Sequence, residues 1–156
     1  MNAEPVLANI AKSFQEYRLE AVLVGNAGAA LQGAPVTTLD FDFMFRKTPT
    51  NLKKVKKVAA ALGMSFSQPY YPASELYRLI QKETGLQLDF MSTLHGVKSF
   101  ESLRSRAIEV YFGTASILVA DLKDIIRSKR ALGRSKDLAV LEILQKTQDE
   151  KEKPQK

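Results

Sequence analysis

The sequence contains no cysteine and a single histidine, His95. Without cysteine the chain can form neither disulfides nor thiolate metal sites, so a bound metal ion must be held by oxygen ligands. His95 follows a strand-like segment without a candidate partner in its loop, and we assign it no role. The chain also lacks any run of about 20 apolar residues, and its first residues do not resemble a signal peptide. We therefore expect a cytoplasmic protein that makes no contact with a membrane.

The size and composition of the chain fit one domain with its own core. It has 156 residues, of which 45% are hydrophobic, and we find no internal repeat or linker. A net charge of +6 favours anionic ligands without choosing among nucleotides, nucleic acid and phosphorylated proteins. We expect a single domain over residues 1–144, followed by a charged and disordered tail over residues 145–156.

Apolar periodicity predicts an α+β domain in which helices pack on a mixed β-sheet. The expected helices cover residues 5–17, a short segment between Gly25 and Gly33, a segment from Thr48 to Gly63, and two C-terminal segments, 121–133 and 135–144. The expected strands cover residues 20–25, 39–45, a hairpin within 74–92 that turns at Thr84 and Gly85, and two short segments, 107–113 and 115–120.

Two aspartates, Asp40 and Asp42, alternate with phenylalanines in the segment LDFDFMF. In a strand their carboxylates leave the same face, while Leu39 and the phenylalanines pack into the core on the other face. A shared proton, solvent or a divalent cation would relieve the repulsion between the two charges. Asp89 lies in a second strand-like run, where an unpaired charge would be costly. A site for Mg²⁺ on these oxygens is therefore one interpretation, and an acidic face on a half-exposed strand is the other.

Gly25 stands between an apolar strand and the small residues of NAGAALQG. This turn leaves free backbone N–H groups and the positive end of a helix dipole beyond the strand, where a phosphate can bind. Neither the dinucleotide-binding pattern nor the P-loop is present. The alternative is that tight packing between strand and helix requires the glycine.

Basic residues at two places each have two interpretations. Lys129 falls on the apolar stripe of the helix that begins at Asp121, so it either extends past the edge of the core or reaches into a cavity that needs a cation, such as a triphosphate site. Four lysines within residues 53–57 fall mostly off the apolar stripe of their helix, which favours a solvated face over a nucleic-acid interface.

The segment VGNAGAALQGAPVTTLDFDF resembles the signature of the DNA polymerase beta-like nucleotidyltransferase superfamily, in which Gly-Gly or Gly-Ser at a helix start precedes Asp-x-Asp and a later third aspartate. Gly25, Asp40, Asp42 and Asp89 match that pattern. The C-terminal helices are also similar to those of the small bacterial branch with minimal nucleotidyltransferases and toxins of the abortive-infection type. The resemblance extends over about residues 22–144.

The resemblance implies a nucleotidyltransferase-type mixed sheet flanked by helices, with two C-terminal helices. It also implies transfer of NMP from NTP to a hydroxyl of an RNA, a protein or a small molecule. In that reaction Asp40 and Asp42 would hold Mg²⁺ or Mn²⁺ on the triphosphate, and Asp89 would help to bind the metal that activates the acceptor. The candidate nucleotide-binding residues are Gly25, Asn26, Thr38 and Lys129.

The chain departs from the pattern of the superfamily at two positions. Asn26 stands where the pattern has its second Gly or Ser, and Val36 stands where many relatives have an arginine two residues before the threonine, Thr38. These departures motivate a second hypothesis, a nucleotide-binding or antitoxin-like interaction protein of the same fold that does not turn over. The small bacterial branch also implies a partner protein encoded nearby, as in a toxin–antitoxin pair.

Overall fold

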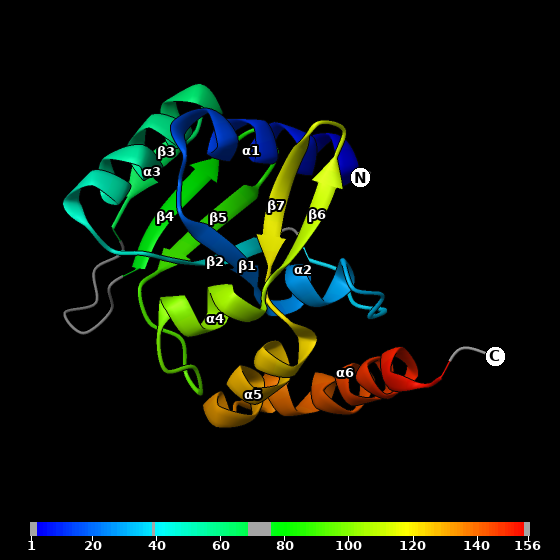
Figure 1. Cartoon of the computed structure of the whole chain (residues 1–156). Coiled ribbons are helices and arrows are strands. Elements are labelled where there is room, and N and C mark those ends of the chain that lie inside the picture. The colour runs from blue at the N-terminus through cyan, green and yellow to red at the C-terminus, as the bar shows by residue number, and fades with distance from the viewer. Residues whose placement is uncertain (1–2, 39, 69–75, 155–156) are drawn as a thin grey trace.

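The computed structural model describes residues 3–38, 40–68 and 76–154. Over these residues the chain forms one mixed β-sheet with the strand order β3-β4-β5-β2-β1-β7-β6 (Figure 1). The strands are β1 (Ala21–Val24), β2 (Asp40–Phe45), β3 (Ser65–Ser67), β4 (Leu76–Gln81), β5 (Leu86–Met91), β6 (Ile108–Phe112) and β7 (Ala115–Val119). The helices are α1 (Ala3–Tyr17), α2 (Gly25–Ala30), α3 (Pro49–Ala61), α4 (Phe100–Arg106), α5 (Leu122–Leu132) and α6 (Ser135–Glu152). The predicted α+β class with a mixed sheet is confirmed.

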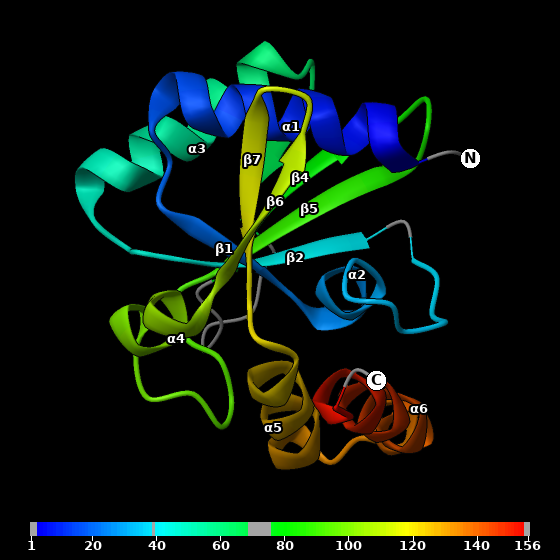
Figure 2. The same ribbon diagram turned by 45° about the vertical axis from the view of Figure 1, so that its right-hand side comes forward.

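Helices cover both faces of the sheet, so the domain has two hydrophobic cores. The helices α1 and α3 pack on one face, whereas α2, α4 and α5 lie on the other, with α6 packed against α5 (Figure 2). Strand β1 lies between β2 and β7 and contributes to both cores, because Leu23 faces the first and Val22 and Val24 face the second. No helix of the described residues is long and apolar enough to cross a membrane.

The alternation in β2 decides where its aspartates lie. Phe41, Phe43 and Phe45 are buried in the core beneath α1 and α3, as predicted. The ring of Phe43 stacks on that of Phe90 from β5, with centroids 5.2 Å apart. Leu39, expected on the same face, lies outside the described residues. The even-numbered positions of β2 therefore face the side of the sheet on which α5 and α6 lie.

Local sequence signals explain most of the element ends. The side chain of Thr48 accepts a hydrogen bond from the backbone N–H of Asn51 at 3.0 Å, and Pro49 follows as the first residue of α3. Gly133 has φ of +63° and ends α5, which sets the turn into α6. The predicted β4–β5 hairpin is present with Gly85 in its turn, and residues 74 and 75 of the predicted segment lie outside the described residues.

One boundary differs from the expectation. Residues 145–152 are helical rather than disordered, because α6 continues to Glu152. Side-chain hydrogen bonds one turn apart support this polar half of the helix, for example from Gln148 Nε2 to Glu152 Oε1 at 2.9 Å. Lys151 Nζ also donates to Gln32 Oε1 at 2.9 Å, which ties the end of α6 to the loop after α2.

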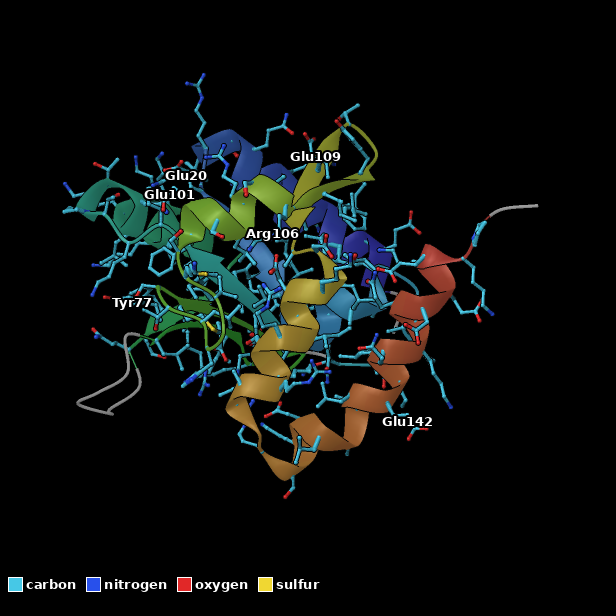
Figure 3. The ribbon with its side chains drawn as sticks, turned by 60° about the horizontal axis from the view of Figure 1, so that its bottom comes forward. Glu20, Tyr77, Glu101, Arg106, Glu109 and Glu142 are labelled. Carbon is cyan, nitrogen blue, oxygen red and sulfur yellow. The ribbon has the colours of Figure 1, made fainter. Side chains whose placement is uncertain are left out.

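Ion pairs fasten α4 to the sheet and to α5. Glu20 and Glu101 lie close together (Figure 3), and the guanidinium of Arg46 bridges them. At the other end of α4, Arg106 Nε donates to Asp124 Oδ2 at 2.8 Å, and Asp124 is only 1% exposed. The pair of Arg106 with Asp124 links α4 to α5 on the face of the sheet from which the aspartates of β2 project.

Candidate active site

The register of the sheet brings three charged residues into one row. Asp42 lies opposite Asp89 in the parallel pair of β2 and β5, and Asp89 lies opposite Arg78 in the antiparallel pair of β4 and β5. Residues that are directly opposite each other project from the same face of a sheet. Asp40, one pleat earlier on β2, extends the row and lies opposite Gln87. Sheet pairing alone therefore gathers the three aspartates predicted for the site.

These residues line a pocket of about 430 Å³ between the sheet and the two C-terminal helices. Its charged lining residues are Asp40, Asp42, Arg78, Asp89, Lys129, Arg134, Lys136 and Asp137. Its other lining residues include Gly25 and His95. The pocket thus brings together five of the seven predicted site residues, whereas Asn26 and Thr38 are not among its lining residues.

Gly25 is required by its backbone and by its neighbour. Its φ of +65° is a conformation that side chains disfavour. A Cβ atom at this position would also lie 2.9 Å from Asp42 Oδ2, closer than real contacts allow. Close packing therefore explains this glycine, because the absence of a side chain leaves room for the carboxylate of Asp42. Phosphate binding at the start of α2 stays a prediction.

The electrostatic field of the pocket acts most strongly on Asp42. Burial, together with the charges of Asp89 and Asp40, raises the pKa of its carboxyl to about 6, against the lowering effect of Lys129 and Lys136. The ionised carboxylate is therefore poorly compensated by the protein alone. A cation bound beside Asp42 would relieve this deficit.

Lys129 is the buried cation of the pocket. It is 9% exposed, and its Nζ lies 3.8 Å from Asp137 Oδ1. Burial lowers the pKa of the ammonium, while the charges of Asp137 and Asp42 raise it. Lys129 is among the residues that line the cavity, and its binding of a triphosphate stays a prediction.

Asp137 holds the cations of the helix pair, and the sequence analysis did not identify it. It is 1% exposed and accepts hydrogen bonds from Arg134 Nε at 2.6 Å and Nη2 at 3.2 Å. This guanidinium lowers the pKa of the Asp137 carboxyl. The available signal was the position of Asp137 in the first turn of α6, where an acidic residue is favoured.

Asp89 has a partner that the sequence analysis also missed. Arg78 Nε donates to Asp89 Oδ1 at 2.8 Å and Arg78 Nη2 to Oδ2 at 3.2 Å, while Gln87 Nε2 donates to Oδ2 at 3.0 Å. The buried charge of Asp89 is therefore compensated. Counting back from the hairpin turn would have placed Arg78 opposite Asp89, because hairpin register follows from the turn.

Asn26 and Thr38 differ in the hydrogen bonds that their side chains make. The Oδ1 atom of Asn26 is buried and has no hydrogen-bond partner among the described residues. The hydroxyl of Thr38 accepts from the backbone N–H of Asp40 at 3.0 Å and donates to its carbonyl at 3.1 Å. In this structure Thr38 therefore shapes the start of β2, and nucleotide binding by either residue stays a prediction.

The two carboxylates of β2 fit a hard divalent cation better than Asp89 does. Mg²⁺ is commonly held by one or two carboxylates together with substrate phosphates and water, a donor set that Asp40 and Asp42 can supply. Asp89 does not fit as a third ligand in this arrangement, since both of its oxygens accept hydrogen bonds. Within the described part of the chain, no three acidic or histidine side chains form a group able to hold a metal ion. The predicted set of three aspartate ligands is thus not assembled here.

The sequence matches no protein-family model and no curated protein sequence. Solved structures with a similar fold include TM1012 from Thermotoga maritima, a candidate nucleotidyltransferase, with a TM-score of 0.60 and 19% identity over 88% of this chain and 89% of that one. The lincosamide antibiotic adenylyltransferase LnuA aligns with a TM-score of 0.65 and 14% identity over 94% of this chain and 98% of its own. The antibiotic-resistance factor ANT(2'')-Ia aligns with a TM-score of 0.63 and 12% identity over 92% and 83%. The chain therefore has the nucleotidyltransferase fold.

Proposed function

We propose that this protein is a nucleotidyltransferase that uses Mg²⁺ or Mn²⁺ to move NMP from NTP to an acceptor hydroxyl. One observation carries the proposal: in a nucleotidyltransferase fold, Asp40 and Asp42 share a pocket with the buried cation Lys129. The raised pKa of Asp42 supports it, because a metal-binding carboxylate is poorly compensated until its ion is bound.

The transfer exchanges one bond to phosphorus for another. The acceptor oxygen forms a bond to the α-phosphorus, the bond from that phosphorus to the bridging oxygen breaks, pyrophosphate leaves, and the hydroxyl proton is released. A bound divalent ion supplies charge stabilisation on the phosphate oxygens. Asp40 and Asp42 hold that ion, and Lys129 attracts the polyphosphate from the side of α5. Arg134 and Lys136 also line the pocket and add positive charge to it.

The acceptor belongs to one of three chemical classes, an RNA, a protein or a small molecule. LnuA was solved with lincomycin bound, and a small-molecule acceptor is the class that this neighbour favours. A protein acceptor encoded nearby would instead correspond to a toxin–antitoxin pair. The net charge of +6 favours an anionic acceptor but does not choose among the three.

The test is incubation with α-labelled NTPs, Mn²⁺ or Mg²⁺ and a cell extract, followed by separation of RNA, protein and small molecules. We expect metal-dependent label in one class, lost with Asp42→Asn. Glu142→Gln is the matched control, because Glu142 is a carboxylate that projects from the outer side of α6, is 81% exposed and does not line the pocket (Figure 3). The proposal fails if the wild-type protein transfers label to none of the three classes.

A second function, nucleotide binding without turnover, has one observation in its favour. Arg78 engages Asp89, the carboxylate to which the superfamily resemblance assigns activation of the acceptor. A protein of this kind would show metal-dependent binding of NTP, with no labelled product from any extract. The same experiment, combined with a binding measurement, therefore separates the two functions.

A further inference from the structure

We infer that the guanidinium of Arg78 takes the place of a second metal ion, so that the site binds a single divalent cation at Asp40 and Asp42. This inference rests on the proposed function, since it specifies how the nucleotide site is charged. It concerns the ion pair of Arg78 with Asp89, which joins β4 to β5 and whose two residues line the pocket.

The geometry of the pair leaves Asp89 little capacity for a metal. Arg78 binds it in the two-pronged arrangement, with Nε 2.8 Å from Oδ1 and Nη2 3.2 Å from Oδ2. Gln87 Nε2 adds a third hydrogen bond, 3.0 Å from Oδ2. A carboxylate has about four sites for accepting hydrogen bonds, and three of them are used here. A metal ion on Asp89 would have to displace these donors and to lie beside a guanidinium of like charge.

The backbone holds the pair in place. Arg78 and Asp89 are directly opposite each other in the antiparallel hairpin, so their Cα atoms cannot move apart without breaking the sheet. Asp89 is 7% exposed, and the loss of its cation would leave a buried charge without compensation. The hydrogen bond to Asp89 raises the pKa of the Arg78 guanidinium and so favours its charged form.

The charges of the row balance with one metal ion. Asp40, Asp42 and Asp89 carry three negative charges when ionised, and all three act on Arg78 to raise its pKa. One divalent cation together with Arg78 supplies three positive charges. Before nucleotide binds, a second divalent cation would leave an excess of positive charge on this face of the sheet, beside Lys129 and the other cations of α5 and α6.

The test is to count bound metal directly. With protein in excess over the non-hydrolysable analogue α,β-methylene-ATP, free Mn²⁺ is measured by electron paramagnetic resonance as Mn²⁺ is added. We expect about one Mn²⁺ per complex for wild type and for Asp89→Asn, because Asp89 is not a ligand. Arg78→Ala should admit a second Mn²⁺ at the freed carboxylate, whereas Arg78→Lys, which keeps the charge, should not.

The outcomes separate the inference from the function on which it rests. Two bound Mn²⁺ in the wild type, or loss of the first Mn²⁺ in Asp89→Asn, would overturn the inference and leave the proposed function standing. If no Mn²⁺ binds to wild type with the analogue present, the proposed function itself fails. The wild-type count alone decides between these results, so the inference is tested even if Arg78→Ala does not fold.

Discussion

The pKa of the Asp42 carboxyl is shifted far from its ordinary value by the environment of this residue. It is half-buried, two carboxylates act on it, and its pKa is raised from 3.8 to about 6. A carboxyl whose pKa is higher in the folded state binds its proton longer than in the unfolded chain. The free energy of unfolding therefore falls as the pH rises from about 4 to about 6 and then stays lower. Above that range the shift corresponds to a cost of up to about 3 kcal/mol.

Asp42→Asn is therefore expected to stabilise the metal-free protein at neutral pH. Urea denaturation in EDTA at pH 7.5 should show a free energy of unfolding roughly 1–3 kcal/mol above that of wild type, because the variant has no charge to bury. The gap should shrink at pH 5 and vanish only well below the ordinary pKa of 3.8, where the wild-type carboxyl is protonated in both states. Glu142→Gln serves as the exposed control and should change stability by less than about 0.5 kcal/mol at each pH. A variant less stable than wild type at pH 7.5 would contradict this account.

At the scale of the element, the turn between α5 and α6 determines where the pocket receives its cations. Gly133 ends α5 in the left-handed conformation, and the chain then re-enters a helix two residues later. This turn brings Asp137 of α6 close to Lys129 and Arg134, and its carboxylate forms an ion pair with each of them. We interpret Asp137 as a positioning residue that directs these two side chains toward the pocket.

Asp137→Asn is expected to weaken the binding of ATP by about tenfold, because Lys129 and Arg134 lose the carboxylate that orients them. Binding of AMP should change much less, since it lacks the β- and γ-phosphates that these cations would meet. Asp137→Glu, which keeps the charge, should restore part of the affinity for ATP. The measurement is calorimetric titration of each variant with both nucleotides in Mg²⁺. Equal losses for ATP and AMP would make the role of Asp137 purely structural.

Elements with a clear apolar period were predictable, and those without one were not. The alternation in β2 and the four-residue spacing in α1 gave the correct structures because each buries an apolar face. Strand β3 has only three residues, and α4 buries only Phe100 and Leu103, so neither shows a period. The last turns of α6 are polar, and their side-chain hydrogen bonds leave no apolar pattern to read.

At the scale of the whole molecule, the predictable part of the site is the part that is local in the chain. Asp40 and Asp42 share a face because a strand alternates, and the sequence alone shows this. Their position opposite Asp89 depends on β2 pairing with β5, and the contact between Lys129 and Asp137 depends on two helices folding together. Such contacts are set by tertiary packing, on which the local pattern carries little information.

The whole domain should respond to nucleotide as one cooperative unit. Mg²⁺ and NTP are expected to bind the folded chain and not the unfolded chain. At a hundredfold excess of ligand over the Kd, such binding adds about 2.7 kcal/mol to the free energy of unfolding, which raises the Tm of a domain this size by roughly 5–10 °C. The Tm of Asp42→Asn should rise far less with Mg²⁺ and NTP. The variant should therefore melt above wild type without metal and below wild type with Mg²⁺ and NTP. Asp89→Asn should keep most of the shift, because Arg78 and not a metal ion occupies that carboxylate. Thermal melts of the three proteins with and without Mg²⁺-NTP measure this, and Glu142→Gln should follow wild type. If wild type shows no shift with any NTP at millimolar concentration, the carboxylates of β2 do not form a nucleotide site.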